Sequence, residues 1–260
     1  MAIIKDYRGE WDVASVKVNF SNGDQRIYSG CKPLIVPNNY KYDPYPKKGD
    51  LINIDGKEYR VLKINGAVAE VVCMYSLNTS IKFDTNSSYN NTYEGKNIDT
   101  YCNNTFYGSL SSAIQSAIVD KTFTQDSWQR TSSSSTSYNG KYGSSTYVMS
   151  LMNKTYGSPI TRHCYCLSVQ DVIDYLEVTT SMTTSDTTLT DTNIRQMFWN
   201  QSTSISQFIW LRSARSSSSD YAFFVSGSDG YLNFNDVTST STAARPAFQI
   251  DLSKIDWSIV

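Results

Sequence analysis

The sequence predicts an α+β fold in which small twisted antiparallel sheets are joined by short helices and long loops. Segments that alternate between apolar and polar residues, separated by Asp-Gly or Asn-Gly pairs, are typical of antiparallel strands with tight turns. Shorter segments carry apolar residues at helical spacing. The remaining long stretches are rich in Ser, Thr, Tyr and Gly. Loops of this length are uncommon in a compact domain unless they carry function.

Residues 1–47 are expected to form an N-terminal arm with a Pro-rich linker. Alternation of apolar and polar residues predicts a strand at residues 11–20, and Ser21–Asp24 indicates a hairpin turn before a second strand. Four of the chain's six prolines follow within residues 33–46, which is typical of a linker or an extended arm. Such an arm would attach the protein to a particle or to further copies of itself. A structural extension of the next domain is the alternative.

Residues 48–260 are expected to form one domain, which opens with a three-stranded antiparallel sheet. With 40% hydrophobic residues, the 260-residue chain can bury a sizeable core. Asp55-Gly56 and Asn65-Gly66 are hairpin signals between apolar-rich segments. The three strands that they separate are expected at residues 50–54, 57–64 and 67–75.

Short helices and one long loop are expected in the middle of the chain. Ser109 is a candidate N-cap for one helix, and Ser168 with Asp171 predicts a capping box for another. Residues 131–147 consist mainly of Ser, Thr, Tyr and Gly, and they are expected to form the long loop. The expected helices cover residues 99–107, 110–121, 169–176 and 192–200.

Four further strands are expected to form a small twisted sheet near the C-terminus. They are placed at Trp210–Leu211, Tyr221–Val225, Tyr231–Phe234 and Ala247–Leu252, with loops at residues 214–220 and 235–243. Arg212 and Arg245 lie near the two ends of this region. Each could pair with a buried carboxylate or with backbone carbonyls and so anchor the sheet, or could be an ordinary strand-terminal arginine.

Charge and hydropathy argue against two classes of partner. The formal net charge is -1 and the basic residues form no run, so nucleic acid is not an expected partner. No apolar stretch approaches the about 20 residues of a membrane span. The N-terminal residues lack the apolar core of a secretory signal, so we expect synthesis in the cytoplasm without a signal peptide.

The cysteines and the single histidine give no sign of a metal or catalytic site. Five cysteines without a C-x-x-C motif argue against a complete disulfide framework. Cys164 and Cys166 lie beside His163, but two or three ligands are too few for a closed zinc site, and buried free thiols on a strand are the favoured interpretation. His163 has no obvious Asp partner and no nucleophile motif. We therefore expect no catalytic residues, no metal and no cofactor.

Several motifs occur in an order found in a known fold. Gly56–Leu62 reads G-K-x-Y-R-V-L, Ser168–Leu176 reads S-V-Q-D-V-I-D-Y-L and Arg245–Leu252 reads R-P-A-F-x-I-D-L. Together with the W-L-R-S motif that starts at Trp210, these segments resemble the C-type lectin-like fold, in the form found in phage and gut bacterial proteins of unassigned function. The resemblance runs from about residue 48 to the C-terminus. It implies the fold, but one fold hosts many functions.

The chain is also similar to the variable proteins of diversity-generating retroelements, in which scrambled adenines turn AAY codons into NNY codons. Such codons cannot encode Lys, Glu, Gln, Met or Trp, and residues 211–248 contain none of these types, although all of them occur elsewhere in the chain. The resemblance implies a non-enzymatic ligand-binding protein whose region 211–248 is a variable surface. Tyr, Ser and Asn suit such a surface, because paratopes combine aromatic contact area with small polar groups. The residues expected to face the ligand are Arg215, Ser217, Asp220, Tyr221, Phe223, Ser228, Asp229, Tyr231, Asn233 and Asn235, although strand alternation places Phe223 or Phe224 in the core.

The expected partner is a protein or a glycan on a cell surface, and the protein is expected on a virion or a cell surface. A structural virion or tail component without diversification is the first alternative. A glycan lectin is the second; Phe234–Val237 resembles the W-N-D motif of calcium-binding lectins, but no E-P-N or Q-P-D motif accompanies it, so binding would be independent of calcium. An enzyme on the same fold is the third, yet the last cysteine is Cys166 and Glu is scarce.

Overall fold

The computed structural model divides the chain into two compact units, residues 1–46 with Ile259 and residues 47–258 with Val260. The structure describes residues 19–21, 24–29, 32–36, 45–75, 77, 80–86, 92–140, 143–176, 187–190, 208–216, 220–226 and 232–260. The helix expected at residues 192–200 lies outside these ranges. Within them, no helix combines the length and the apolar character that crossing a membrane requires.

The first unit contains a three-stranded antiparallel sheet in the order β1-β2-β3. Its strands are β1 (Asn19–Ser21), β2 (Asp24–Ser29) and β3 (Lys32–Val36). Ser21 pairs with Asp24 across the first turn, so the expected hairpin is confirmed. The first part of the strand expected there, residues 11–18, and residues 37–44 of the Pro-rich segment lie outside the described residues.

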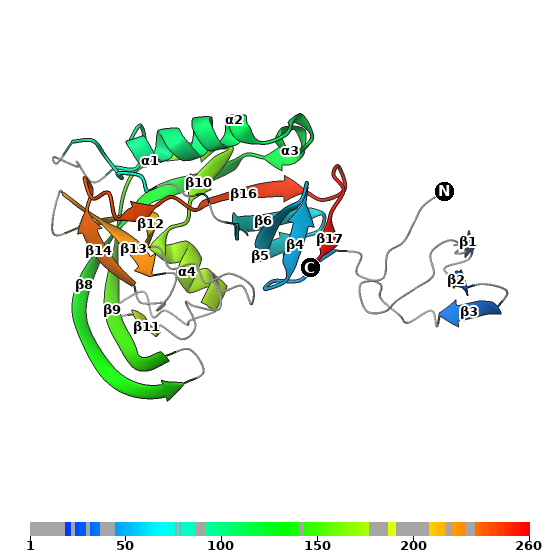
Figure 1. The fold of residues 1–260 in the computed structure, drawn as a ribbon, viewed down its shortest axis with the longest axis horizontal. Helices are drawn as coiled ribbons and strands as arrows, with labels where there is room; N and C mark the ends of the chain where they lie inside the picture. The colour runs from blue at the N-terminus through cyan, green and yellow to red at the C-terminus, as the bar shows by residue number, and fades with distance from the viewer. Residues whose placement is uncertain are drawn as a thin grey trace. The chain divides into compact units, whose positions relative to one another are not determined.

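The second unit is mixed α+β, with two seven-stranded sheets and a few short helices (Figure 1). The first sheet has the order β10-β16-β6-β5-β4-β17, and β7 pairs with β16. Its strands are β4 (Leu51–Ile54), β5 (Lys57–Asn65), β6 (Val68–Cys73), β7 (Ile118–Val119), β10 (Cys164–Cys166), β16 (Pro246–Asp251) and β17 (Ser258–Ile259). The three strands expected after residue 48 are confirmed as β4, β5 and β6, which pair antiparallel. Asp55 and Gly56 have φ values of 53° and 75°, and positive φ at both central positions is what a tight type I′ turn requires.

Short helices within residues 97–117 lie along β10 and β16 of the first sheet, and a further helix contacts the second sheet (Figure 1). They are α1 (Asn97–Thr100), the π-helix η2 (Tyr101–Phe106), α2 (Tyr107–Ser109), α3 (Ser112–Ala117) and α4 (Val169–Leu176). The helix expected at residues 99–107 is confirmed within the continuous α1-η2-α2 stretch. The N-cap of α3 is Ser111, whose Oγ accepts from the backbone N–H of Ile114 at 3.4 Å. Ser109 was the wrong cap, because it still belongs to α2, where its hydroxyl donates to the carbonyl of Phe106.

The capping box expected at the start of α4 is confirmed. The backbone N–H of Ser168 donates to Asp171 Oδ2 at 2.8 Å, and the backbone N–H of Asp171 donates to Ser168 Oγ at 3.0 Å. These reciprocal bonds satisfy backbone donors that the helix cannot satisfy internally. They also fix the Asp171 carboxylate at the first turn, where the helix dipole favours a negative charge.

The second sheet has the order β11-β9-β8-β12-β13-β14, and β15 pairs with β12. Its strands are β8 (Lys121–Gly140), β9 (Gly143–Arg162), β11 (Thr187–Thr190), β12 (Phe208–Arg215), β13 (Tyr221–Ser226), β14 (Leu232–Asp236) and β15 (Thr242–Ala243). The long loop expected at residues 131–147 is wrong for the described residues, because β8 and β9 form a hairpin that closes at Gly140 and Gly143. Thr and Tyr favour strands, and Asn139-Gly140 is itself a hairpin signal, so composition alone was misleading here.

The four strands expected near the C-terminus are present, but they do not form one sheet. β12, β13 and β14 pair antiparallel in the second sheet, whereas β16 lies between β10 and β6 in the first. Arg245 secures this crossing, because its Nη1 donates to the carbonyl of Cys73 at the end of β6. Ala247 then pairs with Val72, and β16 continues along β6.

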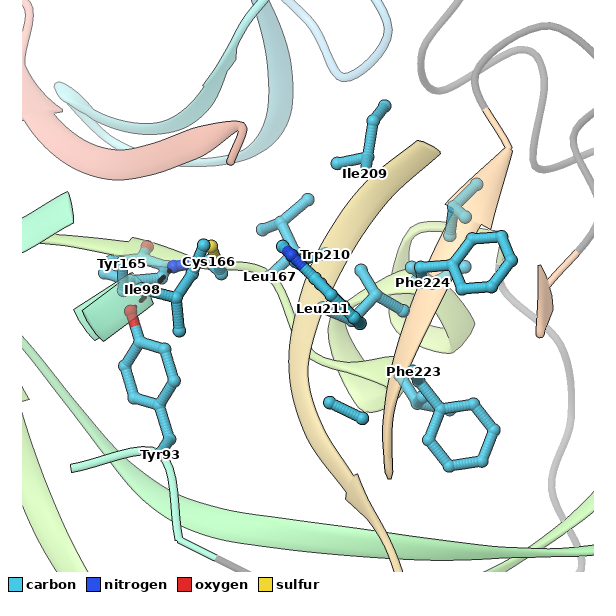
Figure 2. Packing of buried hydrophobic residues seen from close by; sticks show 14 of the residues in the cluster. Tyr93, Ile98, Tyr165, Cys166, Leu167, Ile209, Trp210, Leu211, Phe223 and Phe224 are labelled. Atoms are coloured by element: carbon cyan, nitrogen blue, oxygen red, sulfur yellow. Dashed lines mark hydrogen bonds between the residues drawn. The ribbon is translucent and has the colours of Figure 1, made fainter. Parts of the chain in front are cut away.

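The core of the second unit draws on both sheets and on α4. Its largest fully buried side chains include Trp210, Tyr59, Tyr93, Tyr165, Phe223 and Phe248. Figure 2 shows the Tyr93 hydroxyl directed at Cys166, whose backbone N–H donates to it at 3.2 Å. In the same view Trp210 and Leu211 of β12 lie beside Phe223 and Phe224 of β13. The strands β12 and β13, which carry part of the expected ligand surface, therefore also contribute side chains to the close-packed core.

Candidate functional site

The expected ligand-facing residues map to β12, β13, β14 and the segments between these strands. Six of them lie in the described part of the chain, namely Arg215, Asp220, Tyr221, Phe223, Asn233 and Asn235. The other four, Ser217, Ser228, Asp229 and Tyr231, lie outside the described residues. All of the six except Phe223 are half-buried, so part of each side chain reaches solvent.

Phe223 belongs to the core and does not face solvent. Its side chain is 0% exposed, and that of its neighbour Phe224 is only 5% exposed. The ring of Phe223 meets that of Phe234 edge-on, with 6.0 Å between the centroids. Phe223 and Phe224 are therefore both core residues, and Phe223 is not available to contact a ligand.

Arg215, Tyr221 and Phe234 form a half-buried cluster on this part of the sheet. The guanidinium carbon of Arg215 lies 3.9 Å from the centroid of the Phe234 ring and 5.4 Å from that of Tyr221. The two rings meet edge-on at 5.7 Å. A cation held over aromatic faces is both attracted and oriented by them. Phe234 was not among the expected ligand-facing residues; it pairs directly with Phe223 across the β13-β14 ladder, so the two rings share one face of the sheet.

The asparagines of β14 use their side chains to hold the chain around them. Asn233 Oδ1 accepts from the backbone N–H of Phe234 at 2.9 Å. Asn235 Nδ2 donates to Ser239 Oγ at 2.9 Å, and Asp236 Oδ1 accepts from the backbone N–H of Thr238 at 2.8 Å. The loop that follows β14 is therefore ordered by its own short polar side chains, as in an Asx-type turn.

Buried contacts anchor both ends of the region from residue 211 to residue 248. Trp210 Nε1 donates to the carbonyl of Ile81 at 2.7 Å. Arg212 Nη1 donates to the carbonyl of Cys166 at 2.7 Å and to Asp171 Oδ2 at 2.5 Å. Arg245 contacts Cys73 as described above. The prediction that the two arginines pair with a carboxylate or with backbone carbonyls is confirmed.

A network of buried charges that no sequence pattern had predicted surrounds Arg212. Lys121 Nζ lies 2.6 Å from Glu70 Oε1 and 3.2 Å from Asp171 Oδ1, so it bridges the two carboxylates. The hydroxyl of Tyr165 donates to Glu70 Oε1 at 2.7 Å. Burial works to raise the pKa of Asp171, but the charges of Arg212 and Lys121 outweigh it and hold the pKa well below its usual value.

Asp126 extends the network on the other side of Arg212. Its two carboxylate oxygens accept from Trp128 Nε1 at 2.7 Å and from Ser213 Oγ at 2.8 Å. Burial nevertheless raises the pKa of Asp126 above its usual value, against the pull of the Arg212 charge. Two carboxylates near one guanidinium thus differ in how readily they take up a proton.

His163 has a carboxylate partner that the sequence did not reveal. Its Nδ1 lies 2.5 Å from Asp120 Oδ1, and its ring stacks on Tyr107 with 4.4 Å between the centroids. Asp120 precedes β8 and His163 follows β9, so the ladder between these strands brings the two together. Cys164 and Cys166 are buried free thiols, and among the described residues no group of three or more His, Cys, Asp or Glu side chains is placed to hold a metal ion.

The buried thiols should resist modification in the folded protein. Burial raises the pKa of Cys73 to about 12, and it also raises the pKa values of Cys102 and Cys164. Because the thiolate is the reactive form, we expect Ellman's reagent to leave these thiols untouched in native buffer at mildly alkaline pH and to label them in denaturant. Cys31 lies outside the described residues, so a Cys31→Ser variant gives the clean measurement. Rapid native labelling of that variant would contradict the burial of the thiols.

One family model matches the chain, that of a domain of unknown function called DUF6273, over residues 68–252. The chain belongs to this family. The DUF6273 match begins at the first residue of β6 and ends just after β16, so it covers the whole second sheet, four strands of the first sheet (β6, β7, β10 and β16) and every residue of the expected ligand surface. No curated protein and no solved structure matches the chain.

Proposed function

We propose that the protein is a non-enzymatic ligand-binding protein that presents a variable surface on β12, β13, β14 and the segments between them, on a C-type lectin-like fold. The observation that carries the proposal is that residues 211–248 combine buried residues that hold the sheet with half-buried residues that reach solvent. Arg212, Phe223 and Arg245 are buried, whereas Arg215 and Tyr221 are half-buried. A frame of this kind tolerates exchange of its surface residues at about ±0.5 kcal/mol each.

Composition supports the same conclusion. The surface offers Tyr and Phe rings for contact area, together with Ser, Asn and Asp for hydrogen bonds, which is the mixture that adaptable binding surfaces use. The absence of Lys, Glu, Gln, Met and Trp from residues 211–248 is consistent with diversification of the region by a retroelement. On this proposal the partner is a protein or a glycan on a cell surface. The protein itself is displayed on a virion or a cell surface, with residues 1–47 as its attachment or oligomerisation arm.

The proposal is tested by a binding screen of the full chain against bacterial surface extracts and a glycan array. Tyr221→Ala and Arg215→Ala should weaken the binding found for the wild type by about tenfold or more, because truncation of a central aromatic or Arg is typically the costliest change in an interface. The melting temperature should stay close to that of the wild type. Tyr107→Ala is the matched control, since Tyr107 is also half-buried and stacked, but lies on α2.

Equal binding by all four proteins would place the ligand elsewhere and would leave a structural virion component as the better function. The gene gives an independent check of diversification. We expect a reverse transcriptase gene nearby, with an imperfect repeat of the coding region for residues 211–248. A locus with tail genes and no such repeat would favour a binding or structural protein whose surface does not vary.

A further inference from the structure

A cavity of about 990 Å³ lies in the second unit, away from the expected ligand surface. Its walls come from β5, β6 and β16 of the first sheet, from β8 and β12 of the second, and from α4. Cavities of roughly 300–1,000 Å³ are typical of small-molecule sites. Among the described residues that line it, none belongs to the segment from Arg215 to Ala243.

The charges in the walls of the cavity balance. The acidic lining residues are Glu70, Asp126, Asp171 and Asp174, and the basic ones are Lys48, Lys63, Lys121 and Arg212. The inner charges are already paired, since Lys121 joins Glu70 to Asp171 and Asp171 also binds Arg212. An ion in the cavity would be repelled by half of these groups and would compete with the existing pairs. An uncharged ligand meets neither obstacle.

Hydrogen-bonding capacity remains in the walls after these pairs are formed. Arg212 contributes little of it, because this residue is only 5% exposed and its Nη1 already binds Cys166 and Asp171. Thr124, Gln170 and Gln249 add hydroxyl and amide groups that can both donate and accept.

We propose that this cavity is a second ligand site, and that its ligand is a small uncharged molecule rich in hydroxyl groups, such as a monosaccharide or another polyol. Hydroxyl groups donate and accept at once, so they can match a wall that combines carboxylate oxygens, amides and a hydroxyl group. The site is independent of the surface on β12, β13 and β14, and it holds whether or not that surface varies.

The test is isothermal titration calorimetry of the full chain with glucose, galactose, N-acetylglucosamine and myo-inositol as uncharged probes. Glycine betaine and sodium phosphate are the zwitterionic and anionic comparisons. At least one uncharged probe should bind, and its affinity should change less than about twofold when the ionic strength rises about tenfold, since screening does not act on an uncharged ligand.

Two matched variants locate the binding. Thr124 is exposed on β8 and lines the cavity, so Thr124→Trp should fill part of it and weaken probe binding at least about tenfold. Thr122 is exposed on the same strand two residues away and does not line the cavity, so Thr122→Trp should leave the affinity unchanged. Both variants should keep the circular dichroism spectrum of the wild type.

The proposal is overturned if no uncharged probe binds the wild type, if Thr124→Trp binds as well as Thr122→Trp, or if only betaine or phosphate binds. Its failure is distinguishable from failure of the proposed function. Thr124→Trp should leave binding to surface extracts intact, and Tyr221→Ala should leave polyol binding intact.

Discussion

Replacing Arg212 by Met should lower the free energy of unfolding by about 3–5 kcal/mol, because the change removes the buried cation that lies between the carboxylates of Asp126 and Asp171. Arg212 is 5% exposed, and its Nη1 lies 2.5 Å from Asp171 Oδ2. Asp126 is also buried, and the charge of Arg212 acts on its carboxylate. Met keeps the aliphatic part of the side chain but not the guanidinium that lies over the Phe123 ring, so the loss reports on the charge together with this cation–π contact. Urea unfolding at neutral pH, followed by circular dichroism, measures the difference.

The double variant Arg212→Met with Asp171→Asn is the control for this interpretation. Removing the carboxylate together with the guanidinium takes away the uncompensated charge, so the double variant should recover part of the lost stability. Lys121 then retains only Glu70 as an ionic partner, so recovery should be incomplete. Equal stability of the wild type and Arg212→Met would show that the network contributes nothing to folding.

The difference in the free energy of unfolding between the wild type and Arg212→Met should be smaller in acid than at neutral pH. The folded-state pKa of Asp171 is depressed, so its contribution is present above the unfolded value of about 3.9 and is lost as the pH falls through the folded value. The folded-state pKa of Asp126 is raised. Its contribution to stability is therefore fully present at a pH below the unfolded-state pKa, and it is lost as the pH rises through the folded-state pKa. Without Arg212 both carboxylates hold protons more readily. The difference in the free energy of unfolding between the wild type and Arg212→Met should therefore start to narrow above about pH 4, where Asp126 takes up a proton in the variant, and should narrow further in stronger acid as Asp171 does.

The parts of the fold that the sequence predicted depend on neighbouring residues. The β4-β5 turn needs only Asp55 and Gly56 with positive φ, and the capping box of α4 needs only Ser168 and Asp171. Signals of this kind lie within a few residues and have one dominant physical cause. From such signals, the sequence predicted the first three strands of the second unit and the start of α4 to within two residues of their observed bounds.

The parts that the sequence missed depend on residues far apart in the chain. Lys121 lies 51 residues from Glu70 and 50 from Asp171, and no local pattern marks the three as one network. The partner of His163 depends on the register of the long β8-β9 ladder. β16 pairs with β6 in the first sheet, and Arg245 just before it binds the carbonyl of Cys73, which lies 172 residues earlier. Such pairings are decided by packing, which propensity and spacing do not encode.

Trp210→Ala should also lower the free energy of unfolding by about 3–5 kcal/mol, the range for removing a large aromatic from a packed core. The side chain is fully buried, its ring meets that of Phe83 edge-on at 5.6 Å, and its Nε1 donates to the carbonyl of Ile81. Ile81 in turn donates its backbone N–H to the carbonyl of Thr242 at 2.9 Å. Trp210 in β12 thus hydrogen-bonds to Ile81, and Ile81 hydrogen-bonds to Thr242, where the loop after β14 ends.

Trp210→Phe separates the hydrogen bond from the volume. It keeps an aromatic ring but leaves the carbonyl of Ile81 without its donor, so we expect a smaller loss of about 1–2 kcal/mol. Hydrogen exchange of the β12 and β15 amides should accelerate in both variants, and more in Trp210→Ala, because β15 pairs with β12 at Phe208 and Ile209. If exchange accelerated uniformly over the second unit, Trp210 would be an ordinary core residue. Acceleration confined to β12, β15 and the loop after β14 would identify it as the anchor of the ligand surface.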